Sequence, residues 1–311
     1  MQLLYFLESL RNPVFDAFFS LITLCGEETV FMAVGMIFFW CVNKHQGYYL
    51  FCVGFFGTVL NQFLKMVFRI PRPWIKDPNF TIVESAREAA SGYSFPSGHT
   101  QTSVGLFGGI ARQNRGRLLR GIMIALCVLV PLSRMYLGVH TPLDVGVSIA
   151  VALILIFAAY PLFRRAEHDP RVMYAVMLVL TAMVTAFLLF VTCHTFPAEV
   201  YSAEQIHNLQ SAQKNAYTLL GCMIGLILLY TVERRWIKFP TEAVWWAQII
   251  KVVVGLLLVI AVKEVLRAPL DALFGSHLIA RSVRYCLIVV AGGILWPLTF
   301  RWFAKLGRAD K

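Results

Sequence analysis

Three short stretches hold the residue types that a phosphate-binding site with acid–base or nucleophilic chemistry would need. Each lies beside the end of an apolar segment. Together they supply three cations, a Ser-Gly turn, two histidines and a carboxylate, in the order Lys65-x6-Arg72-Pro73, Pro96-Ser97-Gly98-His99 and Ser133-Arg134-x5-His140-x3-Asp144.

The three cations suit a phosphate dianion. Arg72 and Arg134 offer planar donor forks that match phosphate oxygens in pairs, and Lys65 adds a compact charge. Desolvated cations in a membrane protein are costly unless they are paired. A bound dianion would satisfy all three.

The Ser-Gly-His turn precedes an apolar run that the sequence predicts to be helical. Free N–H groups at a helix N-terminus bind anions, and Gly98 lets the backbone approach closely. The Ser97 hydroxyl would cap this helix, donate to a phosphate oxygen, or do both.

His140 and Asp144 are four residues apart, and Pro142 between them fits the first turn of a helix. The spacing places both on one helical face. A carboxylate there can hold the imidazole tautomer and leave the other ring nitrogen as a nucleophile. His99, from a different helix, could protonate a leaving oxygen. Each stretch alone also fits a plain turn, an interfacial cation or a surface pair; their joint occurrence favours a site.

The elements that must position these residues are membrane helices. Hydrophobic residues make up 58% of the 311 residues and charged residues 14%, against about 25% charged in soluble domains. This excludes a soluble globular enzyme, a disordered protein and a nucleic-acid binder. The segment 13–25 carries Asp16 and either spans the membrane or lies in its interface. Apolar stretches of roughly spanning length lie at 28–43, 47–68, 99–111, 121–138, 143–163, 172–193, 215–232, 244–262 and 281–300.

We therefore expect an all-α polytopic bundle of about nine to ten transmembrane helices. With the N-terminus inside, Lys and Arg residues occur in every turn assigned to the cytoplasmic side. Lys65, Arg72 and Arg134 fall at the opposite face, where this rule disfavours cations. The Lys and Arg residues behind the net charge of +11 thus include many that indicate the orientation in the membrane and a smaller group that indicates a phosphate site. We expect a multi-pass protein, most simply of the cell membrane, with its site on the non-cytoplasmic side.

The three stretches resemble the signature of the type 2 phosphatidic acid phosphatase family, which includes lipid phosphate phosphatases, glucose-6-phosphatases and vanadium haloperoxidases. The resemblance covers residues 28–163 and every signature position. It implies a six-helix phosphatase core within residues 1–170. The additional four-helix membrane region, 171–311, is similar to the extended architecture of sphingosine-phosphate phosphatases and glucose-6-phosphatases.

The resemblance also implies roles. His140 would attack phosphorus and form a phosphohistidine, Asp144 would orient it, and His99 would protonate the departing alkoxide and then activate water. Ser133 would support Arg134. Neither a metal nor a cofactor is expected. The phosphoryl oxygens would be held by Lys65, Arg72, Ser97, Gly98 and Arg134.

The expected function is metal-independent hydrolysis of an amphiphilic lipid phosphate or diphosphate. Two alternatives stay open: transfer of the phosphate to another lipid, and a lipid-binding or lipid-transport protein without catalysis. The expected partners are the phosphorylated lipid substrate and membrane lipids, with no nucleic acid. The motifs leave open which lipid is used, the oligomeric state and the role of residues 171–311.

Overall fold

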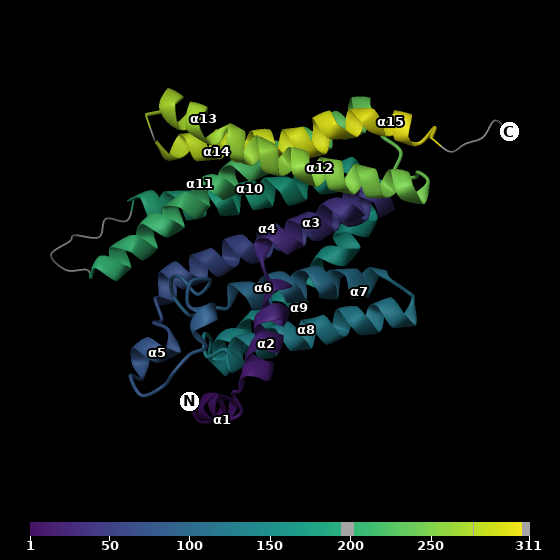
Figure 1. Cartoon of the computed structure of the whole chain (residues 1–311). Coiled ribbons are helices and arrows are strands. Elements are labelled where there is room, and N and C mark those ends of the chain that lie inside the picture. Colours follow the sequence, from purple (N-terminus) through teal and green to yellow (C-terminus); the bar gives the residue numbers. More distant parts are fainter. Residues whose placement is uncertain (194–201, 276, 307–311) are drawn as a thin grey trace. The chain divides into compact units, whose positions relative to one another are not determined.

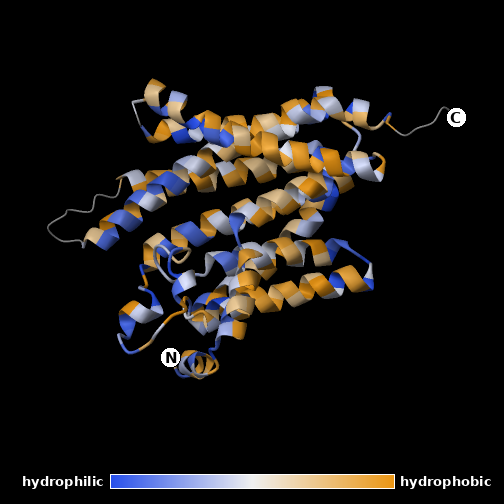
Figure 2. Ribbon diagram, in the orientation of Figure 1, coloured by the Kyte–Doolittle hydropathy of each residue, from blue (hydrophilic) through white to orange (hydrophobic). Residues whose placement is uncertain are grey.

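The computed structural model describes residues 1–193, 202–275 and 277–306. Within these ranges every regular element is helical and no strand occurs (Figure 1). Apolar residues dominate most of the long helices, although the first part of α11 is hydrophilic (Figure 2), and many large apolar side chains are exposed. Lipid tails are as apolar as these side chains, so such a surface suits a bilayer. The all-α membrane architecture expected from the sequence is confirmed.

Six described helical stretches are long and apolar enough to cross a membrane, which makes the chain a multi-pass membrane protein. A bent pair at 13–24 and 28–42, with an angle of 51°, would count as a seventh span. This is fewer than the nine to ten expected, because the stretches expected at 99–111 and 244–262 are helical but are not among the six. The six stretches are Lys44–Lys76, Arg117–Tyr136, Pro142–Ala166, Pro170–Cys193, Ala203–Ile237 and Leu278–Phe303.

The described residues divide into two compact units. The first contains 1–32, 49–168 and 202–211, and the second contains 33–48, 169–193 and 212–306 apart from residue 276. The second unit thus recruits a segment from the N-terminal part of the chain. The sequence-based division at residue 170 stays a prediction.

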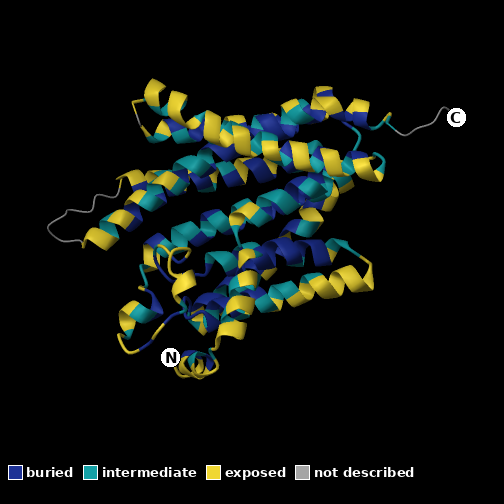
Figure 3. Ribbon diagram, in the orientation of Figure 1, coloured by how far each residue is buried: buried dark blue, intermediate teal, exposed yellow. Residues whose placement is uncertain are grey.

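The first unit is built around a short buried helix. The helix α6 and the π-turn η3 that continues it pack against both α8 and α9, and Figure 3 shows α6 as largely buried while α8 exposes much of its length. Its elements are α1 (Gln2–Ser9), α2 (Pro13–Leu24), most of α4 (Lys44–Phe68), α5 (Pro73–Lys76), η2 (Glu84–Ala86), α6 (Gly98–Ser103), η3 (Val104–Gly108), α7 (Gly109–Gln113), α8 (Arg117–Tyr136) and α9 (Pro142–Ala166).

Local chemistry fixes where these helices begin. Asn12 caps α2 by accepting from the backbone N–H groups of Val14 and Phe15, and Pro13 occupies the first helical position. Thr141 and Asp144 form a capping box at the start of α9. The helix α3 (Glu28–Ile37) and its π-turn η1 (Phe38–Val42) lead from the first unit into the second.

The second unit consists of long helices and short turns. The helix α12 packs against α14 and against η1, and the turns η4 and η5 also touch. Buried Lys251 donates to the carbonyl oxygens of Trp40 and Thr241, each at 3.0 Å, so its charge is solvated by backbone. The elements are α10 (Pro170–Cys193), α11 (Ala203–Val232), η4 (Glu233–Ile237), α12 (Trp245–Val265), α13 (Arg267–Leu273), α14 (Leu278–Val290), η5 (Ala291–Leu295), η6 (Trp296–Thr299) and α15 (Phe300–Phe303).

Candidate active site

The guanidinium of Arg72 donates hydrogen bonds to two different loops. It is only 3% exposed, and its Nε donates to Gly92 O at 3.0 Å and its NH2 to Ser91 O at 2.8 Å. Its NH1 donates to Val139 O at 2.9 Å. The loop before α6 is thereby joined to the turn between α8 and α9. Most Arg72 donors are thus used by the protein itself.

The same guanidinium also fixes the ring of His140. Arg72 NH1 lies 2.9 Å from His140 Nε2, and because arginine only donates, Nε2 must accept. The proton of the neutral imidazole is then on Nδ1, which faces Asp144 Oδ2 at 3.6 Å. Burial, with the positive charge of Arg72 next, lowers the pKa of His140 well below its ordinary value. His140 is therefore a neutral base with its Nε2 lone pair directed at a cation.

The carboxylate of Asp144 is hydrogen-bonded to Ser94 and Thr141 and not to His140. Its Oδ2 accepts from Ser94 Oγ at 2.6 Å and from the Thr141 N–H at 2.7 Å, whereas 3.6 Å to His140 is too long for a hydrogen bond. The spacing predicts that both residues lie on one face of a helix, and this prediction is wrong. Thr141 is the N-cap of α9, so His140 precedes the helix, and the capping box brings the carboxylate toward it.

The turn before α6 has the predicted helix-start geometry. Ser97 is the N-cap, and its Oγ accepts from the Thr100 N–H at 3.4 Å. Its own N–H donates to the carbonyl oxygen of Asp144 at 3.2 Å. A Cβ added to Gly98 would lie 3.8 Å from Asn61 Oδ1. Asn61 is buried, and both polar atoms of its side chain lack a hydrogen-bond partner among the described residues.

Lys65 approaches the same region from the C-terminal part of α4. Its ammonium donates to Tyr93 O at 2.8 Å, one residue from Gly92, which Arg72 holds. Lys65 is also within electrostatic range of Arg72, Arg134 and Asp144. The cations that the sequence singled out therefore converge in the first unit, although they come from α4, the α4–α5 loop and α8.

Arg134 has the largest unused donor capacity of these cations. It is 0% exposed, and its NH1 donates to Thr23 Oγ1 at 2.7 Å. Its Nε and NH2 find no hydrogen-bond partner within the described ranges. The expectation that Ser133 supports Arg134 is wrong, because Ser133 Oγ donates to Val130 O at 2.6 Å inside α8. Buried donors without partners call for a ligand or water. The Nε and NH2 groups of Arg134 are therefore available to bind an anion.

A cavity of about 370 Å³ lies beside Arg134 and His99. His99 Nε2 is buried and has no hydrogen-bond partner in the described part of the chain. Thr23, Glu27 and Glu88 add hydroxyl and carboxylate groups to the cavity wall.

The structure thus brings all eight predicted site residues into one region of the first unit. The electrostatic neighbours of His140 include Arg72, Arg134, Lys65 and His99. Sequence reasoning missed Thr23, Asn61 and Ser94. Asn61 carried a signal, as an amide within an apolar stretch one helical turn before Lys65; Thr23 and Ser94 carried none, because their partners are distant in sequence.

Comparison with known proteins shows the family of this chain. The model of the PAP2 superfamily matches residues 45–168, and that of the transmembrane extension of PAP2 superfamily phosphatases matches 217–309. The undecaprenyl-diphosphatase BcrC of Bacillus subtilis is 30% identical over 151 residues, which cover 47% of this chain and 74% of BcrC. The chain belongs to the PAP2 superfamily.

Other PAP2 relatives differ in length from this chain. A probable sphingosine-1-phosphate phosphatase of Dictyostelium discoideum is 32% identical over 166 residues, 49% of this chain and 39% of that protein. Sphingosine-1-phosphate phosphatase 1 of Mus musculus is 23% identical over 262 residues, 80% of this chain and 59% of the mouse protein. The chain therefore spans less than two thirds of either relative. No solved structure matches the chain.

Proposed function

We propose that this PAP2 protein is a membrane phosphatase that hydrolyses a lipid phosphate or diphosphate through a phosphohistidine. The observation that carries the proposal is the state of His140: its Nε2 faces Arg72 at 2.9 Å, and its Nδ1 faces Asp144. A neutral imidazole with a lone pair at a cation-lined site is a nucleophile for phosphorus. Simple anion binding would not need this arrangement.

In the proposed first step, His140 Nε2 forms a bond to phosphorus and the ester P–O bond breaks. The leaving oxygen takes a proton from His99, whose protonation is favoured by the negative charge of the bound phosphate. Arg134, Lys65 and the remaining Arg72 donor stabilise charge on the phosphoryl oxygens, with Ser97 and the Gly98 N–H. In the second step His99 accepts a proton from water, the water oxygen bonds to phosphorus, and the P–N bond breaks to free His140.

The proposed substrate is amphiphilic because of where the site lies and what the relatives do. The site residues are at helix ends of a membrane protein, where lipid headgroups lie. The relatives named above are a diphosphatase of undecaprenyl diphosphate and phosphatases of sphingosine-1-phosphate. We place the site on the non-cytoplasmic side of the cell membrane, from the distribution of cations in the turns.

The test is phosphate release by the purified protein in detergent with EDTA. The panel contains sphingosine 1-phosphate, phosphatidic acid, undecaprenyl diphosphate and glucose 6-phosphate. We expect release from one or more of the lipids, and loss of at least about 10³-fold in His140→Ala. His168→Ala, an exposed histidine after α9, is the matched control and should keep full activity. Undiminished release in His140→Ala would overturn the assignment.

A further inference from the structure

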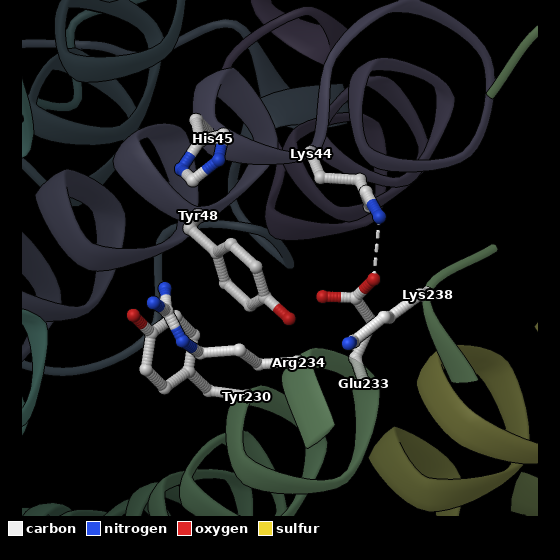
Figure 4. A pocket seen from close by; sticks show the side chains of 7 residues that line it. All are labelled: Lys44, His45, Tyr48, Tyr230, Glu233, Arg234 and Lys238. Atoms are coloured by element: carbon white, nitrogen blue, oxygen red, sulfur yellow. Dashed lines mark hydrogen bonds and ion pairs between the residues drawn. The ribbon is translucent and has the colours of Figure 1, made fainter. Parts of the chain in front are cut away.

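A second polar cavity, of about 160 Å³, lies within the second unit and is distinct from the proposed active site. Three cations line it: Lys44 at the start of α4, and Arg234 and Lys238 at the end of α11. Figure 4 shows these side chains around the rings of Tyr48 and Tyr230. The PAP2 chemistry derived above uses none of them.

One carboxylate also borders the cavity, and its charge is already compensated. Glu233 is buried, and its Oε1 lies 2.5 Å from Lys44 Nζ (Figure 4). Lys44 also lies over the ring of Phe239, 4.7 Å from its centroid. The Lys44–Glu233 pair is close to neutral, so Arg234 and Lys238 leave the cavity with a net charge of about +2 when His45 is neutral.

The backbone adds to this positive potential. Asn43 accepts from the N–H groups of His45 and Gln46, so α4 begins at this point. The positive end of a helix dipole favours anions and disfavours cations, yet Lys44 lies in the first turn of α4, which has no acidic residue. Glu233 offsets the charge of Lys44, but the charges of Arg234 and Lys238 beside this helix start remain, so a further anion would be stabilised there.

The end of α11 is shaped so that its cations reach the cavity. The helix closes with the π-turn η4, and Lys238 then takes the left-handed conformation, with φ 44°. A non-glycine residue with positive φ is uncommon, and π-turns are frequent at functional sites. The Lys238 N–H donates to Glu233 O at 2.9 Å, which stabilises this turn. Arg234 and Lys238 are thereby held on the same side as Glu233.

A buried hydroxyl faces the same space. Tyr230 is 3% exposed, and its hydroxyl makes no hydrogen bond of normal geometry to the described residues, although the Arg234 guanidinium lies beside it (Figure 4). A donor in this position suits a phosphate oxygen. If these cations served only to orient the chain in the membrane, they would need neither a cavity nor a buried hydroxyl beside them. We propose that this cavity is a phosphate-group site, filled by an anionic lipid headgroup or by free inorganic phosphate.

The experiment compares adjacent arginines in purified full-length protein in phosphatidylcholine nanodiscs. Phosphatidylglycerol, whose phosphodiester is not the monoester of the proposed reaction, is added in one arm and inorganic phosphate in the other. Binding is followed by native mass spectrometry and by the shift in unfolding temperature. We expect Arg234→Gln and Lys238→Gln each to weaken binding about tenfold. Arg235→Gln removes a neighbouring cation that does not line the cavity and lies over Trp236 instead, so it should bind as the unsubstituted protein does.

Tyr230→Phe removes the hydroxyl without a change in charge and should weaken binding by a smaller factor, with the unfolding temperature of the free protein unchanged. Binding of phosphatidylglycerol alone identifies a lipid headgroup, and displacement by inorganic phosphate identifies the shared anion chemistry. Binding of inorganic phosphate alone identifies the free ion as the source. Equal losses in Arg234→Gln and Arg235→Gln would show diffuse surface attraction and overturn the site, as would absence of binding in both arms. Neither result depends on whether the protein releases phosphate.

Discussion

Two buried arginines of the same signature do different work at the scale of single residues. Arg72 donates hydrogen bonds to three backbone carbonyl oxygens and to His140 Nε2. Arg134 uses one donor on Thr23 and leaves Nε and NH2 without partners among the residues described. In the proposed mechanism Arg72 is therefore mainly a positioning residue for two loops and a histidine, whereas Arg134 has free donors that would bind the phosphate.

Replacing Arg134 by lysine should weaken catalysis without unfolding the protein. Lysine keeps the charge but lacks the planar fork, so transition-state oxygens lose paired hydrogen bonds. We expect kcat/KM to fall about 10²- to 10³-fold, with an unchanged unfolding temperature. Steady-state kinetics on the best lipid and thermal unfolding in detergent check both parts.

Arg72→Lys should behave differently in the same two assays. It removes hydrogen bonds to Gly92, Ser91 and Val139 together, and buried carbonyl oxygens left unpaired each cost about 1–3 kcal/mol. Both kcat/KM and the unfolding temperature should fall. If the two lysine variants were equally stable, the positioning role of Arg72 would be wrong.

Helix ends determine the site at the scale of elements. The bent break between α2 and α3 carries Gly26, whose added Cβ would lie 3.0 Å from both Cβ and O of His99 and 2.9 Å from Val130 Cγ1. The capping box of α9 holds Asp144. Neither element touches phosphate in our proposal, yet both set where His99 and Asp144 lie.

Gly26→Ala should therefore lower activity through His99. The methyl group would lie 3.0 Å from Cβ and O of His99 and 2.9 Å from Val130 Cγ1, so we expect the backbone around His99 to shift by a few tenths of an ångström. We expect kcat to fall about 10-fold, less than the roughly 10²-fold loss that a misplacement of 1 Å can cause. Gly146→Ala in α9 has open space around the new methyl group and should retain full kcat. Equal kcat values for the two variants would contradict this coupling.

Thr141→Ala should separate capping from catalysis. It removes the acceptor for the Asp144 N–H but leaves the Thr141 N–H, which donates to Asp144 Oδ2 at 2.7 Å. We expect a loss of about 1 kcal/mol in stability and a kcat within about twofold. Thr192→Ala, whose hydroxyl donates only within α10, serves as the control with little effect. A collapse of kcat at unchanged stability would mean that Thr141 contacts the substrate.

The sequence predicted more of the site than of the element ends that build it. The three-part spacing predicted the cations, both histidines and the carboxylate, because motif residues are close in sequence. It placed His140 inside a helix, although the N-cap at Thr141 starts α9 after it. Ser94 and Thr23 could not be foreseen, since they meet Asp144 and Arg134 only after residues 50 and 111 positions apart fold together. One of the expected spans, 99–111, forms the short buried helix α6 with η3 and α7, because apolar composition alone does not separate a short buried helix from a membrane-crossing one.

At the scale of the whole molecule, the distribution of charge supports the proposal that the two ends of the first unit lie on opposite sides of the membrane. Arg112, Arg115, Arg117 and Arg120 surround the start of α8, and Arg134 with its cavity lies at the end of the same helix. From the positive-inside rule we propose that residues 112–120 lie in the cytoplasm and that the site lies on the opposite side of the membrane.

Cysteine labelling tests this assignment. In a variant without native cysteines, Glu88→Cys at the cavity rim should react with a membrane-impermeant maleimide in intact cells, because Glu88 lines the cavity beside Arg134. Arg115→Cys should react only after the cells are permeabilised. The reverse pattern would put the site in the cytoplasm and overturn the proposed side.

The capping box has a further consequence for how such a protein can lose its activity. Asp144 is at once the carboxylate facing His140 and the third residue of the 25-residue helix α9, where its side chain completes the capping box. Substitutions there damage folding as well as chemistry, so cellular quality control would remove them. His140 and His99 cap no helix, so we expect their substitution to leave the helices intact. A duplicated copy that abandons catalysis should therefore diverge first at the histidines and keep the aspartate.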